Sequence, residues 1–250
     1  MLRVEGITQV FGGVTALRNV SFSVARDEIK GVIGPNGAGK TTLFNIITGI
    51  YRQTAGDVFL ENEKVTSFQP EKLARRGMVR TFQNVELFGT MTVLENVMVG
   101  LHTKTRSGII SSCLKFPSHL REEKHIREKA LSCLDFVDLA NEASMVAGNL
   151  PFGKGRMLEI ARAMALDPRI ILLDEPAAGL NSRETAELGS LIRKIRASGV
   201  TVVLVEHDME LVMDICDTIL VLNLGQRLAE GTPREIQEDP SVIAAYLGEG

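Results

Sequence analysis

One glycine-rich stretch constrains this chain more than any other feature of its sequence. It reads Gly34-Pro35-Asn36-Gly37-Ala38-Gly39-Lys40-Thr41. The stretch matches the P-loop pattern G-x-x-x-x-G-K-[ST], and it stands between an apolar run at 31–33, expected to be a strand, and a helix predicted from about Lys40 to Ile47. In that setting backbone N–H groups face phosphate oxygens, Lys40 reaches the β- and γ-phosphates, and Thr41 binds Mg²⁺. A glycine-rich turn without a ligand is the alternative, and it leaves the strand-to-helix context unexplained.

Two further strand ends carry side chains with useful chemistry. The apolar run 170–173 ends in Asp174 and Glu175, and ligands of parallel sheets bind at the carboxyl ends of the strands. We expect Asp174 to hold Mg²⁺ and Glu175 to orient and activate the attacking water. The alternative is that either carboxylate only caps the following turn. His207 follows the run 200–205 in the same way and is expected to touch the γ-phosphate, with a purely structural histidine as the alternative.

The spacing of apolar residues predicts an α/β protein. Residues 20–24 alternate apolar and polar side chains, as the strands of an antiparallel sheet do. The runs 170–173 and 200–205 lack this alternation, which is typical of strands buried on both faces of a parallel sheet. Residues 91–148 read as mostly helical, because apolar residues recur there at helical spacings. The predicted fold class is a P-loop NTPase (RecA-like) α/β core with an antiparallel β subdomain and an inserted α-helical subdomain.

Composition limits the partners and surroundings of the chain. Of its 250 residues, 44% are hydrophobic and 24% are charged, as in a folded globular protein. The net charge of -3 gives no positive field to attract nucleic acid, so no nucleic-acid partner is expected. The three cysteines form no disulfide or metal-ligand pattern, which favours a reducing, cytoplasmic setting. No signal-peptide stretch or membrane-spanning apolar run is visible, so membrane contact is expected through a partner.

A single ATPase domain is expected over residues 1–250. Residues 1–90 and 150–232 are predicted to form the nucleotide-binding core with the β subdomain. Residues 91–149 are predicted to form the helical subdomain, and residues 233–250 a C-terminal helix or tail.

Together these residues resemble the ATP-binding-cassette (ABC) ATPases, and the resemblance covers nearly the whole chain. It implies that the chain binds and hydrolyses ATP with Mg²⁺, and that Thr42 joins the P-loop in binding the nucleotide. Phe11 resembles the aromatic residue that stacks on adenine, and a core phenylalanine is the alternative. Gln83 resembles the glutamine that links Mg²⁺ and the attacking water to the transmembrane partner, and a solvated side chain is the alternative.

One segment departs from the family pattern. Where the family usually has Leu-Ser-Gly-Gly-Gln, just before a helix predicted over 156–166, this chain has Leu150-Pro151-Phe152-Gly153-Lys154. In the family, two ATPs bind between head-to-tail cassettes, and this segment meets the γ-phosphate held by the other subunit. The resemblance therefore places Pro151, Phe152, Gly153 and Lys154 at the nucleotide. Because Pro151 lacks the serine hydroxyl and the N–H while Lys154 adds a charge, we expect an anion site with altered chemistry.

Within the family, the chain resembles the ATPases of bacterial branched-chain amino acid importers. The segments that carry this narrower resemblance are Phe11-Gly12-Gly13-Val14, Arg80-Thr81-Phe82-Gln83-Asn84, Glu175-Pro176-Ala177-Ala178-Gly179-Leu180-Asn181 and Ala245-Tyr246-Leu247-Gly248-Glu249. It implies three kinds of partner: a second ABC ATPase subunit in a homo- or heterodimer, transmembrane permease subunits and, indirectly, an extracytoplasmic solute-binding protein. It also implies a peripheral position on the cytoplasmic side of the cell (inner) membrane. Relatives that serve urea, short amides or lipopolysaccharide export leave the solute open.

The expected function is ATP-driven import of a small solute, with branched-chain or related amino acids favoured. One alternative is a soluble ABC-class ATPase that regulates a nucleic-acid or ribosome complex. Such proteins usually carry two cassettes or a long coiled-coil insert, and the sequence shows one cassette and no sustained heptad run. Another alternative is a P-loop kinase, which would need an acceptor-substrate site and leaves Gln83 and His207 without roles.

Overall fold

The computed structural model describes residues 1–81, 87–102 and 117–247, with the backbone alone at 102, 117–122 and 247. Contacts between residues divide the chain into two units. We call Met1–Gln83 with Arg169–Gly250 the core unit and Asn84–Pro168 the helical unit. The subdomain boundaries given above, at 91, 149 and 233, stay predictions.

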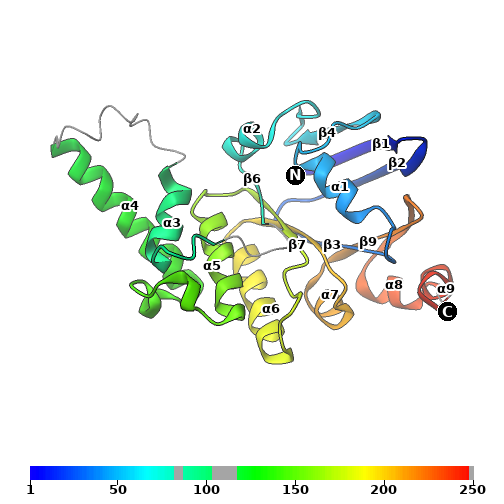
Figure 1. Ribbon diagram of the computed structural model, residues 1–250. Coiled ribbons are helices and arrows are strands. Elements are labelled where there is room, and N and C mark those ends of the chain that lie inside the picture. Colours follow the sequence, from blue (N-terminus) through cyan, green and yellow to red (C-terminus); the bar gives the residue numbers. More distant parts are fainter. Residues whose placement is uncertain (82–86, 103–116, 248–250) are drawn as a thin grey trace. The chain divides into compact units, whose positions relative to one another are not determined.

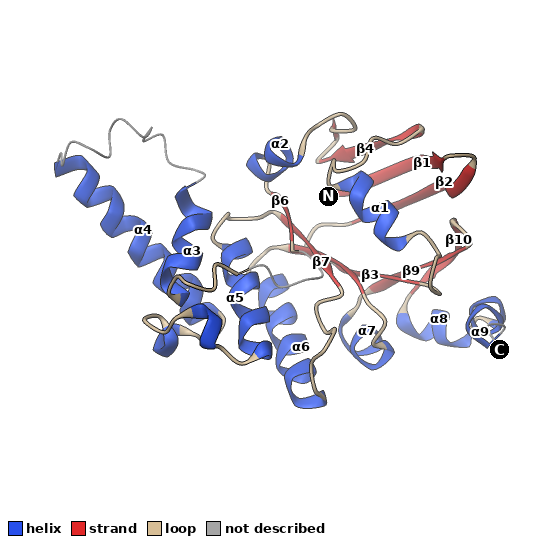
Figure 2. Ribbon diagram, viewed as in Figure 1, coloured by secondary structure: helices blue, strands red, loops and turns tan. Residues whose placement is uncertain are grey.

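Two sheets build the core unit (Figures 1 and 2). Their strands are β1 (Leu2–Phe11), β2 (Val14–Val24), β3 (Ile29–Ile33), β4 (Ala55–Leu60), β5 (Glu63–Lys64), β6 (Met78–Arg80), β7 (Ile170–Asp174), β8 (Thr201–Val205), β9 (Thr218–Asn223) and β10 (Gln226–Gly231). The four-stranded sheet has the order β2-β1-β4-β5 and pairs antiparallel. The six-stranded sheet has the order β10-β9-β3-β8-β7-β6, with β10 antiparallel to β9 and the other pairs parallel.

The burial of the strands follows from their sequence patterns. In β1, buried Leu2 and Val4 alternate with exposed Arg3 and Glu5, so one face of the antiparallel sheet meets water. In β3, β7 and β8 every residue is buried, because both faces of the parallel sheet are covered. The antiparallel region and the two later strands predicted from the sequence are therefore present.

The helix that follows the P-loop lies between the two sheets (Figure 1). The helices of the core unit are α1 (Lys40–Ile47), α2 (Pro70–Arg75), α6 (Ser182–Ala197), α7 (Met209–Ile215), α8 (Pro233–Glu238) and α9 (Pro240–Leu247). Leu43, Phe44 and Ile47 of α1 share one apolar cluster with residues of both sheets, among them Leu17 and Val203. Because α1 is fixed on both sides, its first turn has a set position above the end of β3.

The helical unit contains α3 (Val93–His102), α4 (Pro117–Phe136), α5 (Phe152–Met164) and two 3₁₀ turns, η1 (Ala140–Glu142) and η2 (Ala147–Asn149). The helix predicted over 156–166 therefore begins earlier, at Phe152, and ends at Met164. Glycine disfavours helix by about 1 kcal/mol per residue, but Gly153 and Gly155 are buried, and packing overrides that preference. Among the helices of the described ranges, none has both the length and the apolar character needed to cross a membrane.

Candidate functional site

The P-loop leaves β3 through a backbone conformation that only glycine adopts here. Gly34 has a φ of 150°, and a Cβ at this position would lie 2.1 Å from the carbonyl oxygen of Leu222. Gly39, with a φ of 100°, is the N-cap of α1, and the first turn of that helix carries no acidic side chain. Asn36, Gly37 and Thr41 are exposed around this loop. A helix N-terminus and a curled glycine loop together form a surface that favours anions.

Lys40 is the cation of this loop. Its side chain is buried, with 6% exposed, and its Nζ donates hydrogen bonds to the carbonyl oxygens of Gly34 at 2.6 Å and Pro35 at 3.0 Å. The ammonium group is thus held inside the curve of the loop. Thr41 is exposed and Thr42 half-buried in the first turn of α1.

Three neighbouring strands end level with one another beside the loop. In the register of the sheet, Val205 of β8 lies opposite both Val32 of β3 and Asp174 of β7. Residues that follow these strands, His207 and Glu175 among them, therefore emerge at the same edge as the P-loop. The sequence predicted this convergence from the rule that parallel strands present their carboxyl ends together.

Asp174 is buried in an ion pair with Arg80. The carboxylate oxygen Oδ2 lies 2.6 Å from Nη2 of Arg80, which stands at the end of β6. Nη1 of Arg80 donates to Oδ1 of Asn45 at 2.7 Å and to Oγ1 of Thr48 at 3.1 Å. Arg80 therefore joins β6, β7 and the P-loop helix around one carboxylate.

Glu175 and His207 face each other across the ends of β7 and β8. Oε1 of Glu175 lies 3.1 Å from Nε2 of His207. Glu175 has a φ of 46°, in the left-handed region that is uncommon and unfavourable for a residue with a side chain. Its backbone N–H donates to the carbonyl oxygen of Val205 at 2.9 Å, and this bond holds it there. Strain of this kind concentrates at functional positions.

The remaining predicted residues of the core unit lie apart from this cluster in the chain. Phe11 ends β1 with 43% of its surface exposed, and its ring meets that of Tyr51 edge-on, at 5.6 Å between centroids. A ring that is half-exposed and braced by a second aromatic is suited to stacking. Tyr51 was not predicted. Gln83 lies outside the described residues.

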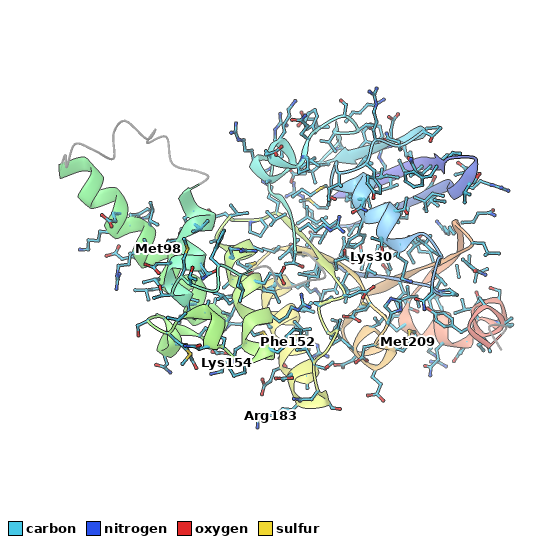
Figure 3. All side chains as sticks on the ribbon, viewed as in Figure 1. Lys30, Met98, Phe152, Lys154, Arg183 and Met209 are labelled. Atoms are coloured by element: carbon cyan, nitrogen blue, oxygen red, sulfur yellow. The ribbon has the colours of Figure 1, made fainter. Side chains whose placement is uncertain are left out.

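The variant segment opens α5 in the helical unit. Pro151 is the N-cap residue, and Phe152 and Lys154 are exposed in the first turn (Figure 3). Lys154 forms an ion pair with Glu142, and the hydrogen bond from its Nζ is the main cause that holds the pKa of Glu142 below the usual value. Gly153 is buried at this helix start. The lysine that the family resemblance placed at a partner's phosphate is thus paired within its own chain.

Comparison with known proteins identifies the family. The profile of the ABC transporter family matches residues 17–178, more than half of the chain. The chain belongs to the ABC transporter family. It is an ATP-binding and ATP-hydrolysing subunit of a transporter. A second profile, described as branched-chain amino acid ATP-binding cassette transporter, matches residues 226–250.

Curated relatives of this ABC subunit match along its whole length. The high-affinity branched-chain amino acid transport ATP-binding protein BraF of Pseudomonas aeruginosa is 48% identical over 250 residues, covering 100% of this chain and 98% of that protein. LivG of Escherichia coli K12, which carries the same description, is 46% identical with the same coverage. The resemblance inferred from the sequence is confirmed.

Solved ABC cassettes have the same fold. The ADP conformation of MJ1267, an ATP-binding cassette of an ABC transporter, has a TM-score of 0.88 at 35% identity and covers 100% of this chain and 99% of that one. A dimeric post-hydrolysis state of the cassette MJ0796, bound to ADP and phosphate, has a TM-score of 0.78 at 29% identity, with 94% and 99% covered. The predicted fold class is confirmed.

Two charged residues of the ABC core unit were given no role by sequence reasoning. Arg80 binds Asp174, and Glu206 is buried beside His207. In each case the available signal was a charged side chain at the carboxyl end of an apolar run, Arg80 as the last residue of β6 and Glu206 directly after β8. Such a position forces the charge to find a partner at the sheet edge, because an isolated buried charge is costly.

Proposed function

We propose that this ABC subunit energises the import of branched-chain or related amino acids. The carrying observation is the match of residues 226–250 to the branched-chain profile, together with full-length relatives that bear that transport description. The matched residues are separate from the nucleotide cradle, by which we mean the P-loop of residues 34–41 with the side chains proposed around it. Their match is therefore evidence additional to the shared ATPase residues. The amino acid itself is bound by other chains of such a system, and this subunit provides the energy.

The cradle fits a magnesium-bound triphosphate. Mg²⁺ at nucleotide sites takes oxygen ligands from one or two side chains and from the phosphates. Thr41 and Asp174 offer a hydroxyl and a carboxylate, and the described residues hold no group of three or more His, Cys, Asp or Glu that would form a closed metal cage. Mg-ATP supplies the phosphoanhydride bond that is cleaved. We assign Thr41, Asp174 and Gln83 to the magnesium ion.

We assign each residue of the cradle a part of the nucleotide according to its position. Residues 34–39 surround the phosphates. The N–H groups of this loop, which Pro35 lacks, bind phosphate oxygens together with the first turn of α1 and Thr42. Lys40 neutralises the charge of the β- and γ-phosphates, since its ammonium group already points into the loop. Phe11, braced by Tyr51, stacks on the base.

Glu175 is our proposed residue for water activation. Its carboxylate is largely buried but reaches the sheet edge, and His207 lies within hydrogen-bond distance of it. Glu175 orients the water and accepts its proton, while His207 holds the carboxylate in place and contacts the γ-phosphate. Gln83 completes the set of residues proposed for catalysis.

Two cassettes act together in this proposal. The segment Pro151-Phe152-Gly153-Lys154 faces the nucleotide of a second ABC subunit, and closure of the pair on ATP moves the permease subunits to which both bind. An extracytoplasmic solute-binding protein delivers the amino acid from the other side. The subunit is then peripheral to the inner membrane, on its cytoplasmic face.

Cross-linking in native membranes, followed by identification of the co-purified chains, tests this assignment. We expect permease chains, and after reconstitution with them we expect ATP-dependent uptake of labelled leucine that Lys40→Ala abolishes. The control Lys64→Ala alters an exposed lysine of β5 and is expected to leave uptake unchanged. Recovery of ribosomal or nucleic-acid complexes in place of permeases would contradict the assignment to transport. Uptake of urea without uptake of leucine would contradict the assignment of amino acids as the solute.

A further inference from the structure

Glu206 is a buried carboxylate whose charge is held by backbone groups of two loops. Only 3% of the residue is exposed. Oε1 accepts a hydrogen bond from the backbone N–H of Ala177 at 2.6 Å. Oε2 accepts from the N–H of His207 at 2.8 Å and of Asp208 at 3.2 Å. One oxygen therefore serves the loop after β7, and the other serves the loop after β8.

These bonds offset a large cost. Burial raises the pKa of Glu206, while the bonds from the N–H groups of Ala177, Asp208 and His207 oppose this shift. A buried carboxylate is unfavourable unless its oxygens are satisfied, and hydrogen bonds from N–H groups to a charged acceptor are among the stronger ones. The Glu206 carboxylate thus links the two loops through hydrogen bonds, which an apolar side chain at this position could not accept.

The two loops carry the pair proposed for catalysis. Ala177 lies two positions after Glu175, and His207 directly follows Glu206 in the chain. Glu175 needs an external constraint, because its φ of 46° is unfavourable for a residue with a side chain. The N–H of Glu175 is fixed to Val205, and the Glu206 carboxylate fixes the same loop further along, at Ala177.

We infer that Glu206 is a positioning residue for ATP hydrolysis, which sets the distance between Glu175 and His207 by bridging the loop after β7 to the loop after β8. This inference rests on the roles proposed above for Glu175 and His207. Glu206 does not touch the nucleotide cradle through its own bonds, so its effect is on the rate of hydrolysis rather than on nucleotide affinity.

Glu206→Gln in the full-length chain is the test. Glutamine keeps the size of the side chain, but it can accept hydrogen bonds at one end only, and its NH₂ group then opposes the N–H groups of one loop. We expect kcat for ATP hydrolysis to fall about ten- to a hundredfold, as for a lost charge-assisted bond, with the Kd for ATP unchanged. Glu206→Asp keeps the charge and the fold but shortens the bridge, and we expect an intermediate kcat.

A double-mutant cycle separates positioning from a general structural role. If Glu206 acts through His207, adding Glu206→Gln to His207→Ala lowers kcat much less than adding it to the parent, because interacting residues are not additive. Glu230→Gln is the matched control. It removes a carboxylate whose ion pairs, with Lys30 at 2.7 Å and with Arg227 at 2.6 Å, involve neither of the two loops, and we expect kcat to be unchanged.

The outcomes are distinguishable. A parent-like kcat in Glu206→Gln, or fully additive losses in the cycle, overturns the inference. A Kd for ATP that rises in step with the loss of kcat overturns it as well. If instead Glu175→Gln and His207→Ala hydrolyse ATP like the parent, the proposed catalytic roles fail, whatever Glu206 does.

Discussion

Arg80 and Asp174 form a buried ion pair, with 2.6 Å between Nη2 and Oδ2, at the point where the P-loop helix, β6 and β7 meet. Removal of one member of such a pair leaves an uncompensated charge. We therefore expect Arg80→Met to lower the free energy of unfolding by about 3–5 kcal/mol, measured by denaturant titration.

The double variant Arg80→Met with Asp174→Asn relieves the uncompensated charge, and part of the lost stability is expected to return. The control Arg183→Met alters an arginine whose side chain is 89% exposed in its pair with Glu187, and its effect is expected to stay within about 0.5 kcal/mol. Equal losses in Arg80→Met and Arg183→Met would show that the buried pair does not stabilise the fold.

Glu175 combines a strained backbone with a proposed role in hydrolysis, and two substitutions separate these properties. Glu175→Gln keeps the strain, whereas Glu175→Gly removes both the strain and the side chain. We expect both variants to lose roughly a hundredfold or more in hydrolysis rate. We also expect Glu175→Gly to be the more stable of the two, by up to about 1 kcal/mol, because glycine adopts a positive φ readily.

Thermal unfolding and steady-state hydrolysis measure the two effects on the same samples. The result that contradicts this account is a glycine variant with a lower Tm than the glutamine variant. Retained hydrolysis in either variant places the water-activating group elsewhere, and His207 is then the next residue to change.

The ion pair between Lys154 and Glu142 predicts a pH dependence in the helical unit. Its hydrogen bond lowers the pKa of Glu142 below the usual 4.5, so the pair stabilises the fold above that pH and ceases to do so as the pH falls through the lowered value. Lys154→Gln is expected to raise the pKa of Glu142, as followed by carboxyl carbon NMR. A Glu142 titration that is identical in parent and variant contradicts the pairing.

The same pair bears on the proposed dimer. Lys154 cannot serve a partner's phosphate while it binds Glu142, so Glu142→Gln is expected to strengthen ATP-dependent dimerisation in a Glu175→Gln background. Lys154→Gln is expected to weaken it. Sedimentation with and without ATP measures both, and a dimerisation constant insensitive to both changes shows that Lys154 is not at the seam.

Asn181 caps α6 through both arms of a capping box. Its side chain accepts hydrogen bonds from the N–H groups of Arg183 and Glu184, and the Glu184 side chain accepts from the N–H of Asn181. Asn181→Ala is expected to lower the free energy of unfolding by about 1 kcal/mol, and Asn181→Asp to preserve it. Ser190→Ala, within the exposed face of the same helix, is the control. Equal stability of Asn181→Ala and the parent contradicts the capping role.

Sequence reasoning reached those parts of the site that depend on contiguous residues or on general rules of sheets. The cradle of residues 34–41 is one uninterrupted motif, and Asp174, Glu175 and His207 follow apolar strands whose ends meet in any parallel sheet. The bonds of Arg80 to Asp174 and of Glu206 to Ala177 were out of reach. They depend on which loop each buried charge can touch, and the sequence does not order the loops in space.

The start of α5 shows a second limit. Local propensity disfavours helix at Gly153 and Gly155, whereas the folded chain buries both within the first turns of the helix. Tertiary packing decided this boundary. The aromatic partner of Phe11 was missed for a related reason, because Tyr51 lies on the far side of α1 in the chain and no spacing rule connects the two rings.

The pairing of β3 has a consequence for folding during synthesis on the ribosome. β3 carries the P-loop, yet its neighbours β8 and β9 are formed by residues 201–205 and 218–223. During synthesis the nucleotide motif therefore leaves the ribosome long before the two strands that pair with β3. Contacts between residues so distant in sequence also form slowly. Nucleotide stabilises only the state that binds it. Cellular ATP therefore does not protect the first half of the chain from proteases during synthesis. Protection by bound ATP begins only after β8 and β9 have been synthesised and have paired with β3.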